Sequence, residues 1–239
     1  MEGRMTTETD RSSRRDFVAD VGRLASAVAL TGCMTSRPAQ ALVLRGPRPV
    51  ASAADWDLSW LDRLTTATDR AVFDWPGIGD PTDPIVMEIA ARYLDNCEAV
   101  YRPNRREVRV VLNVRTQGVP AALTDAAWER HALGVEYTVK DTATQQPAVR
   151  NPFWRRAPGP ITAETPPTLE ELVQRGAIVL VCDFALGHLA KRLAGKTGRD
   201  ADEVHRELRG AFVPGSFAVP SGIFGLARSQ NAGCALVRM

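Results

Sequence analysis

The chain has 239 residues, of which 44% are hydrophobic and 24% are charged, and its formal net charge is +2. This composition suits one globular domain with terminal extensions and excludes collagen-like and low-complexity chains. The small net charge, without a long basic block, gives sequence-independent nucleic-acid binding little electrostatic support, so we expect no nucleic-acid partner.

The cysteines and histidines lack the spacing of common metal sites. Cys33, Cys97, Cys182 and Cys234 lie far apart without a C-x-x-C pair, and the three histidines have no H-E-x-x-H spacing. The sequence also lacks the G-x-G-x-x-G and Walker patterns that cradle nucleotide phosphates. We therefore predict neither a metal nor another cofactor.

Residues 1–41 carry the features of an export signal. The paired arginines of "SSRRDFV" resemble a twin-arginine signal, and the apolar stretch "LASAVALTG" follows them. Ala39-Gln40-Ala41 then has the small-x-small form of a cleavage site. These features predict export to the periplasm, and the alternative is a disordered tail with a chance arginine pair.

A second feature of this region concerns the membrane. "LTGC", which ends at Cys33, resembles a bacterial lipobox, whose cysteine is lipidated. Lipidation at Cys33 and cleavage after Ala41 both stay open. A single lipid would tether the chain to a membrane surface through its N-terminus only. No apolar run approaches the roughly 20 residues of a spanning helix.

Residues 42–67 are expected to form a linker with a short helix near 58–66, and residues 68–239 the folded domain. The run "RAVFDWPG" (70–77) predicts a buried strand that proline and glycine end. Asp83 and Pro84 favour a helix start. The next helix is expected to share one apolar face over four residues at helical spacing: Ile85, Ile89, Tyr93 and Cys97.

The middle of the chain predicts a strand over 107–114, from "EVRVVLNV", and a helix over 119–133. Residues 135–167 are rich in proline and polar residues and predict a long loop insertion, which is usually functional or disordered. Structure resumes with a capped helix over 168–176 and the strand "AIVLVC" (177–182). Helices near 185–194 and 200–208 follow, and strands over 216–221 and 234–239 flank a last helix.

Strands that alternate with helices indicate right-handed βαβ units and a mostly parallel sheet. We predict an α/β fold: a flavodoxin-like three-layer sandwich with about five strands. In such sheets ligands bind beyond the carboxyl ends of the strands. Cys182 stands at one of these ends.

The C-terminal third carries a family resemblance. "VLVCDFALGHLAKR" and "FVPGSFAVPSGIFGLARSQNAGCALVRM" resemble the DsrE/DsrF-like family, in which a strand ends in a cysteine and a later strand ends in V-P-[AS]-G. Cys182 matches the family cysteine, and Ser221 and Gly222 match the second element. "LTDAAWERH" and "TATQQPAVRNPFW" resemble an exported branch of the family with twin-arginine signals, over roughly 68–239.

This resemblance implies a DsrE-like fold, homo-oligomers and, in the best-understood members, relay of sulfur as a cysteine persulfide. A sulfur-donor or sulfur-acceptor protein is then an implied partner, and any enzyme activity is at most that of a sulfurtransferase-like carrier. The family often places a histidine after the second strand. Here Asn113, Arg115 and Gln117 stand in that region, so the role of that histidine does not carry over.

Cys182 is the candidate reactive residue, because a thiol at a helix N-terminus feels the positive end of the helix dipole, which favours thiolate. Arg115 and His188 are candidate assistants, whereas the carboxylate of Asp183 opposes a thiolate. Two hypotheses stay open. Either Cys182 carries sulfur, or the chain is a non-catalytic periplasmic module that binds a small ligand or a protein, and Cys182 only packs.

The remaining candidates are residues that could line a binding site. Aromatic side chains near and in the long loop either wall a pocket at the sheet edge or anchor the loop to the core. Asn151 precedes a proline and predicts a turn. The candidate binding residues are Trp128, Asn151, Phe153, Trp154, Ser221 and Gly222.

Overall fold

The computed structural model describes residues 56–101, 107–156, 159–162 and 165–238. The predicted export signal, the cleavage site after Ala41 and the lipidation site at Cys33 lie outside these residues and stay predictions. In the described part of the chain, no helix is both long enough and apolar enough to cross a bilayer.

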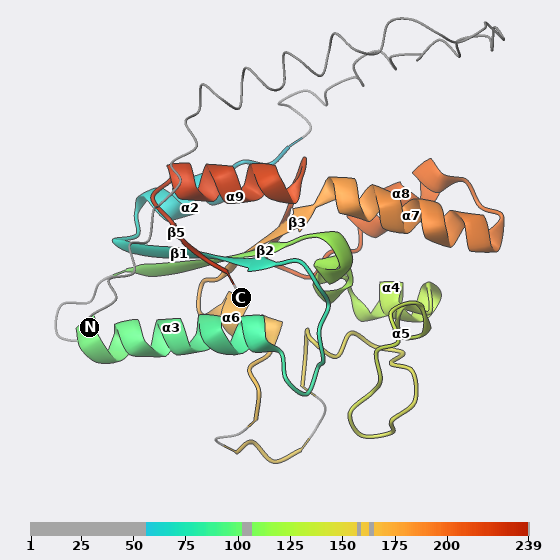
Figure 1. Cartoon of the computed structure of the whole chain (residues 1–239), viewed down its shortest axis with the longest axis horizontal. Helices are drawn as coiled ribbons and strands as arrows, with labels where there is room; N and C mark the ends of the chain where they lie inside the picture. Colours follow the sequence, from blue (N-terminus) through green and yellow to red (C-terminus); the bar gives the residue numbers. More distant parts are fainter. Residues whose placement is uncertain (1–55, 102–106, 157–158, 163–164, 239) are drawn as a thin grey trace, which may run out of the picture. The chain divides into compact units, whose positions relative to one another are not determined.

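Five parallel strands form one sheet in the order β4-β3-β2-β1-β5 (Figure 1). The chain adds β2, β3 and β4 on the same side of β1 and then reverses to place β5 on the other side. This arrangement confirms the predicted flavodoxin-like α/β fold. The strands are β1 (Asp69–Trp75), β2 (Val108–Val114), β3 (Ile178–Cys182), β4 (Ser216–Val219) and β5 (Ala235–Val237).

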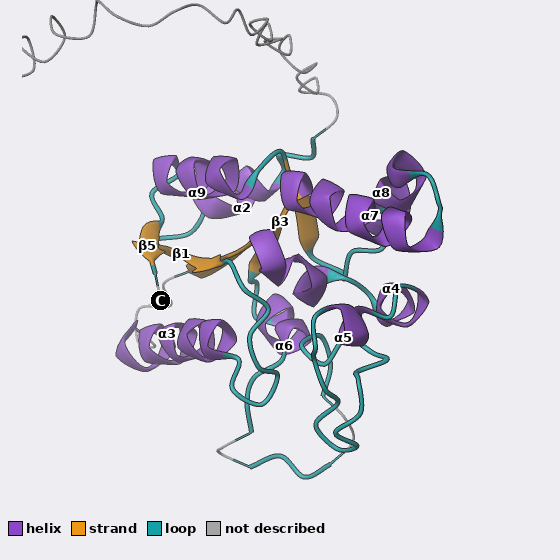
Figure 2. Cartoon of the chain, turned by 45° about the vertical axis from the view of Figure 1, so that its right-hand side comes forward, coloured by secondary structure: helices purple, strands orange, loops and turns teal. Residues whose placement is uncertain are grey.

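Helices cover both faces of the sheet because successive strand residues point to opposite sides. Phe73 belongs to one apolar cluster, on the side of α3 (Ile85–Tyr101) and α6 (Leu169–Gln174). Val72 belongs to the other, with α2 (Trp60–Thr65) and α9 (Gly222–Asn231). Figure 2 shows the two layers on either side of the strands. Burial on both faces explains why β3 is apolar throughout.

Four further helices lie on the side toward which the strands point (Figure 1). The short 3₁₀ helix η3 (Thr116–Ala122) leads from β2 toward them. Their place matters because ligand sites of parallel sheets lie at the carboxyl ends of the strands. These helices are α4 (Asp125–Arg130), α5 (Leu133–Glu136), α7 (Asp183–Thr197) and α8 (Ala201–Arg209).

The structure corrects the helix predicted over 119–133. η3, α4 and α5 replace it, with breaks at two positions. Pro120 lies within η3, where a proline has no N–H to give to a continuous helix, and Leu123 is extended. Ala132 adopts a left-handed conformation with φ of 47°, which no α-helix tolerates.

The buried face of α3 also differs from the prediction. Ile85 is 49% exposed, and Ile89 and Tyr93 are only partly buried. Cys97 is buried as expected. The apolar stripe is therefore rotated from the predicted one, and its buried residues are Val86, Met87, Ala90, Leu94 and Cys97.

The long loop between α5 and α6 carries no helix or strand in its described residues. It is nevertheless attached to the core, because Ala148, Phe153 and Trp154 are buried. A single β-bridge joins Lys140 to Pro147. The loop is thus a packed part of the domain at these points.

Candidate functional site

Cys182 is both the last residue of β3 and the N-cap of α7, with no residue between the two elements. Its Sγ accepts a hydrogen bond from the backbone N–H of Ala185 at 3.4 Å. The residue is 5% exposed. The thiol therefore lies at the carboxyl edge of the sheet, as predicted, but it is recessed there.

Arg115 follows β2 and pairs with Asp74, which lies one residue before the end of β1. Nε donates to Oδ1 and Nη2 donates to Oδ2, each at 2.7 Å. These hydrogen bonds hold the pKa of Arg115 above its usual value, and a smaller electrostatic contribution comes from Cys182. Arg115 is therefore close enough to the Cys182 thiol to act on it electrostatically. Its guanidinium is held by two hydrogen bonds to the carboxylate of Asp74.

Ser221 and Gly222 begin α9 beside this pair. The Ser221 hydroxyl caps the helix by accepting the N–H of Phe224 at 3.1 Å. A Cβ on Gly222 would lie 2.7 Å from Cβ of Arg115 and 2.8 Å from its Cδ. Glycine is therefore needed at this position so that the stem of Arg115 can pass against α9.

Asn113 lies beside Asp74 on the neighbouring strand and is fully buried. Its Nδ2 donates to Asp74 Oδ1 at a long 3.4 Å, and its Oδ1 has no hydrogen-bond partner. That oxygen faces α9, because a Cβ on Gly225 would lie only 2.5 Å from it. The second glycine of α9 thus makes room for a buried polar side chain.

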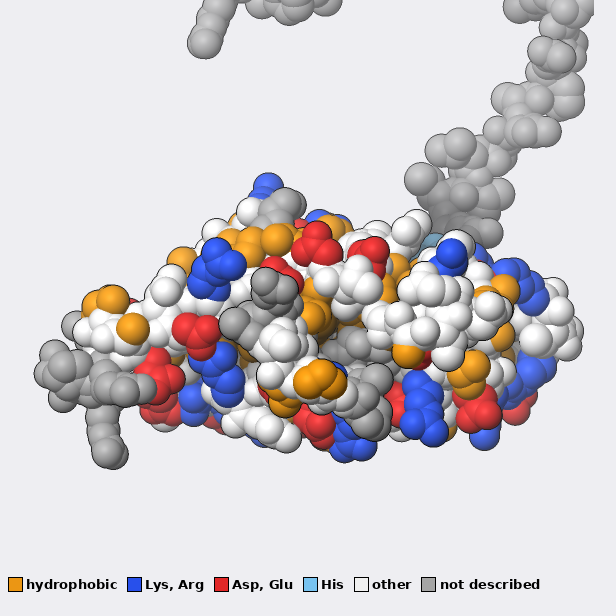
Figure 3. All heavy atoms as spheres, turned by 90° about the horizontal axis from the view of Figure 1, so that it is seen from below, with side chains coloured by type: hydrophobic (Ala, Val, Ile, Leu, Met, Phe, Trp, Pro, Cys, Tyr) orange, Lys and Arg blue, Asp and Glu red, His pale blue; other side chains and the backbone are white. Residues whose placement is uncertain are grey.

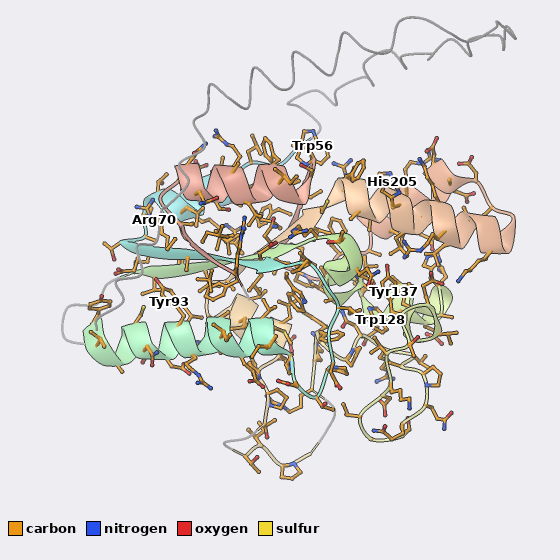
Figure 4. The ribbon with its side chains drawn as sticks, in the orientation of Figure 1. Trp56, Arg70, Tyr93, Trp128, Tyr137 and His205 are labelled. Atoms are coloured by element: carbon orange, nitrogen blue, oxygen red, sulfur yellow. The ribbon has the colours of Figure 1, made fainter. Side chains whose placement is uncertain are left out.

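Asp183, directly after Cys182, contacts α8. Nε2 of His205 lies 3.1 Å from Asp183 Oδ1, and Nε of Arg209 lies 3.8 Å from the same oxygen. The Arg209 guanidinium in turn lies over the ring of Trp56, 4.6 Å from its centroid. Figure 4 shows Trp56 and His205 above the strand ends. Nothing in the sequence pattern had pointed to His205.

His188 does not approach Cys182 in this arrangement. It is exposed on α7, and its ring packs edge-on against Phe184, with the centroids 4.7 Å apart. Phe184 itself is 55% exposed. Of the two predicted assistants, the structure places Arg115 near the thiol and His188 on the outer side of the helix.

The aromatic residues that the sequence left open between a pocket wall and a core anchor are core residues in the structure. Trp128 and Phe153 are fully buried and Trp154 is nearly so. The Trp128 Nε1–H donates to the carbonyl of Pro120 at 2.9 Å, and Phe153 packs between Trp128 and Trp75. These rings anchor the long loop to the core, which is the second of the two alternatives.

Asn151 has the same structural role. Its Nδ2 donates to the carbonyls of Ala121 and Leu123, and its Oδ1 accepts the N–H of Phe153. Its own N–H donates to Asp125 Oδ1 at 3.0 Å. The side-chain amide and the backbone N–H of Asn151 are therefore used to hold the loop.

A separate cavity of about 440 Å³ lies between the loop after β1 and the loop after α5. Its walls include Asp80, Tyr137 and Lys140. Thr138 and Gln145 also line it, with φ of 57° and 59°. Left-handed backbone at such residues costs energy and is enriched at ligand sites.

No group of three or more His, Cys, Asp or Glu side chains in the described residues is arranged to hold a metal ion. Cys97, Cys182 and Cys234 are all free thiols. On the face in Figure 3, acidic and basic side chains are interspersed. The chemistry available at the strand ends is therefore that of a thiol, two carboxylates, a histidine and two arginines.

Two parts of this site were not expected from the sequence. Asp74 interrupts the apolar run of β1, and a polar residue near the carboxyl end of a buried strand is a usable signal. The sequence contains no comparable signal for the contact between Asp183 and His205, because this contact depends on how α7 packs on α8. Helix packing, and not sequence spacing, brings these two side chains together.

No protein-family model matches the chain, and no curated protein matches it. Among solved structures, it is similar to the protein of unknown function MTH1491 from Methanobacterium thermoautotrophicum, with 17% identity and a TM-score of 0.32. That match covers 72% of this chain and 99% of the other.

Proposed function

We propose that this chain is an exported thiol carrier that accepts sulfane sulfur at Cys182 and passes it on. The position of Sγ carries the proposal: it caps α7 at the carboxyl edge of a parallel sheet and accepts the N–H of Ala185. A thiolate gains more from that hydrogen bond and from the helix dipole than a thiol does. Arg115 adds a cation within electrostatic reach.

The burial of Cys182 narrows the class of sulfur donor. With 5% of the residue exposed, a small inorganic polysulfide reaches Sγ more easily than the surface of a protein does. The same recess shields a bound persulfide from reductants. The resemblance to the DsrE/DsrF-like family further implies a second copy of this chain and a sulfur-acceptor protein as partners.

The loading step is a nucleophilic displacement. The Cys182 thiolate attacks a terminal sulfur of a polysulfide dianion, and the new S–S bond forms as the adjacent S–S bond of the polysulfide breaks. The electron pair of the broken bond leaves on a polysulfide dianion shortened by one sulfur. Cys182 is left as a persulfide anion, so atoms and charge balance without another oxidant.

The test is to incubate the folded full chain with inorganic polysulfide and to locate adducts by peptide mass spectrometry. We expect one added sulfur at Cys182 in the wild type and none at this position in Cys182→Ser. Cys97→Ser is the matched control, because Cys97 is also a buried free thiol, and it should keep the adduct. An adduct confined to the other cysteines contradicts the proposal.

The second candidate is a binding module in which Cys182 only packs. The observation in its favour is the 440 Å³ cavity, whose size suits a small ligand and whose walls carry an acidic and a basic residue, Asp80 and Lys140. Hydrogen bonds from Thr82 hold the pKa of Asp80 below its usual value, so this carboxylate is ionised at neutral pH. Opposite charges in one small cavity favour a zwitterion.

Ligand-observed NMR with a panel of free amino acids tests this second candidate. We expect saturation transfer to at least one amino acid with the wild type and its loss in Lys140→Ala. Lys191→Ala, at an exposed position on α7 away from the cavity, is the control and should keep the signal. Absence of transfer to every member of the panel contradicts this function.

A further inference from the structure

We infer that Asp183, His205 and Arg209 form a charge switch that regulates the reactivity of Cys182, with His205 as its positioning residue. This inference rests on the proposed function, because it concerns the same thiol. It identifies a group that neither the sequence pattern nor the family resemblance assigned. The switch is defined by three side chains of α7 and α8 and by the cysteine that precedes them.

The contacts join the residue that follows the thiol to two basic groups. Asp183 is the first residue of α7 and follows Cys182 directly. Its Oδ1 lies 3.1 Å from Nε2 of His205, in the middle of α8, and 3.8 Å from Nε of Arg209, the last residue of α8. The Asp183 side chain is 17% exposed and the His205 side chain is 26% exposed, so solvent screens their interaction only in part.

The sign of the effect follows from the charges. A negative carboxylate beside Cys182 disfavours a second negative charge on Sγ. A protonated His205 balances that carboxylate, which makes the thiolate easier to form. When His205 loses its proton, only Arg209 remains to balance Asp183, at the longer distance, and the thiolate is disfavoured again.

The other charged groups around the thiol do not change charge in the neutral range. Arg115 stays cationic, because its hydrogen bonds to Asp74 hold its pKa above the usual value. Arg209 stays cationic because an arginine does not lose its proton in this range. His205 differs from Arg115 and Arg209 in this respect, because histidine is the side-chain type that changes charge between about pH 5 and 8.

The experiment measures the rate constant for alkylation of Cys182 by iodoacetamide from pH 5 to 10, in the folded full chain, with peptide mass spectrometry to isolate this cysteine. We expect the pH profile of the wild type to show two phases, a fast one at low pH and a slow one at high pH. The rate constants extrapolated from the two phases to the same pH should differ by about threefold or more. His205→Gln keeps a hydrogen-bond donor without the charge and should follow the slow phase throughout. Asp183→Asn removes the carboxylate, so its Cys182 should react faster than that of the wild type at every pH.

Opposite directions for these two variants separate electrostatic control from a loss of structure, which would move both alike. Arg206→Gln is the control, because Arg206 is an exposed neighbour on α8, and it should keep two phases. Two phases in His205→Gln overturn this inference and leave the carrier proposal standing. No alkylation of Cys182 at any pH overturns the carrier proposal and this inference together.

Discussion

Arg115 and Asp74 join the ends of neighbouring strands through two parallel hydrogen bonds of 2.7 Å. The Asp74 side chain is 9% exposed and that of Arg115 is 33% exposed. We expect Asp74→Asn to lower the free energy of unfolding by about 2 kcal/mol, because it removes the charge and one acceptor from a largely buried contact. Urea denaturation measures the loss.

The control for this change is a surface ion pair of the same kind. Arg175 and Asp95 lie 2.6 Å apart, but 64% of the Asp95 side chain is exposed. Asp95→Asn should change the unfolding free energy by less than about 1 kcal/mol. Equal losses of unfolding free energy in Asp74→Asn and Asp95→Asn would show that the contact at the strand ends stabilises the fold no more than a surface ion pair does.

Gly225→Ala should destabilise the domain, because the new Cβ would lie 2.5 Å from Oδ1 of Asn113. Overpacking of this kind costs about 1–3 kcal/mol, and thermal unfolding measures it. Adding Asn113→Ala should restore part of the loss by removing the clashing atom. Gly195→Ala, in an open part of α7, should instead stabilise the helix by up to about 1 kcal/mol.

His131 gives the stability a pH dependence of definite sign. Burial lowers its pKa below the ordinary 6.5, against the attraction of Glu207, whose Oε1 lies 3.3 Å from Nε2. The unfolded chain therefore takes up the proton first as the pH falls, and stability is lost below about pH 6.5. Above that pH the ring is neutral in both states and contributes no such loss.

Unfolding free energies of the wild type and His131→Gln, measured from pH 5 to 8, check this prediction. The wild type should lose stability relative to the variant as the pH falls from 7 to 5. The difference should be constant above pH 7. A wild type that instead loses stability relative to the variant as the pH rises would mean that the folded state, and not the unfolded one, holds the proton more tightly.

Cys234 should react slowly with alkylating reagents at neutral pH. Burial raises its pKa to about 11, although Arg70 acts in the opposite direction. At pH 8 the thiolate fraction is then about one in a thousand, so alkylation should be slow and should rise about tenfold per pH unit up to pH 10. Peptide mass spectrometry after iodoacetamide treatment measures this rise, and a plateau by pH 9 would contradict it.

Much of the fold follows from local sequence. The apolar run that ends at Cys182 predicted β3, and Thr168 with Glu171 predicted the capping box that begins α6. These features depend on residues close together in the chain. The segment around Pro120 and Ala132 was predicted less well, because the apolar period suggested one helix where backbone restrictions produce three short pieces.

Of the candidate site, only the residues at the carboxyl ends of strands could be predicted from the sequence. Cys182 and Arg115 end or follow adjacent strands of a parallel sheet, so their proximity could be expected. The partners of Asp74 and Asp183 depend on register and on helix packing, which the sequence does not state. The aromatic residues of the loop were ambiguous for a different reason, because Trp128 and Phe153 suit a pocket wall and a core equally well.

The junction at Cys182 has a mechanical consequence. Because β3 passes into α7 without a connecting residue, the backbone has no slack where the sulfur sits. An atom added to Sγ competes with the hydrogen bond that the Ala185 amide donates to it, so we expect covalent occupancy of this sulfur to weaken the N-terminal cap of α7.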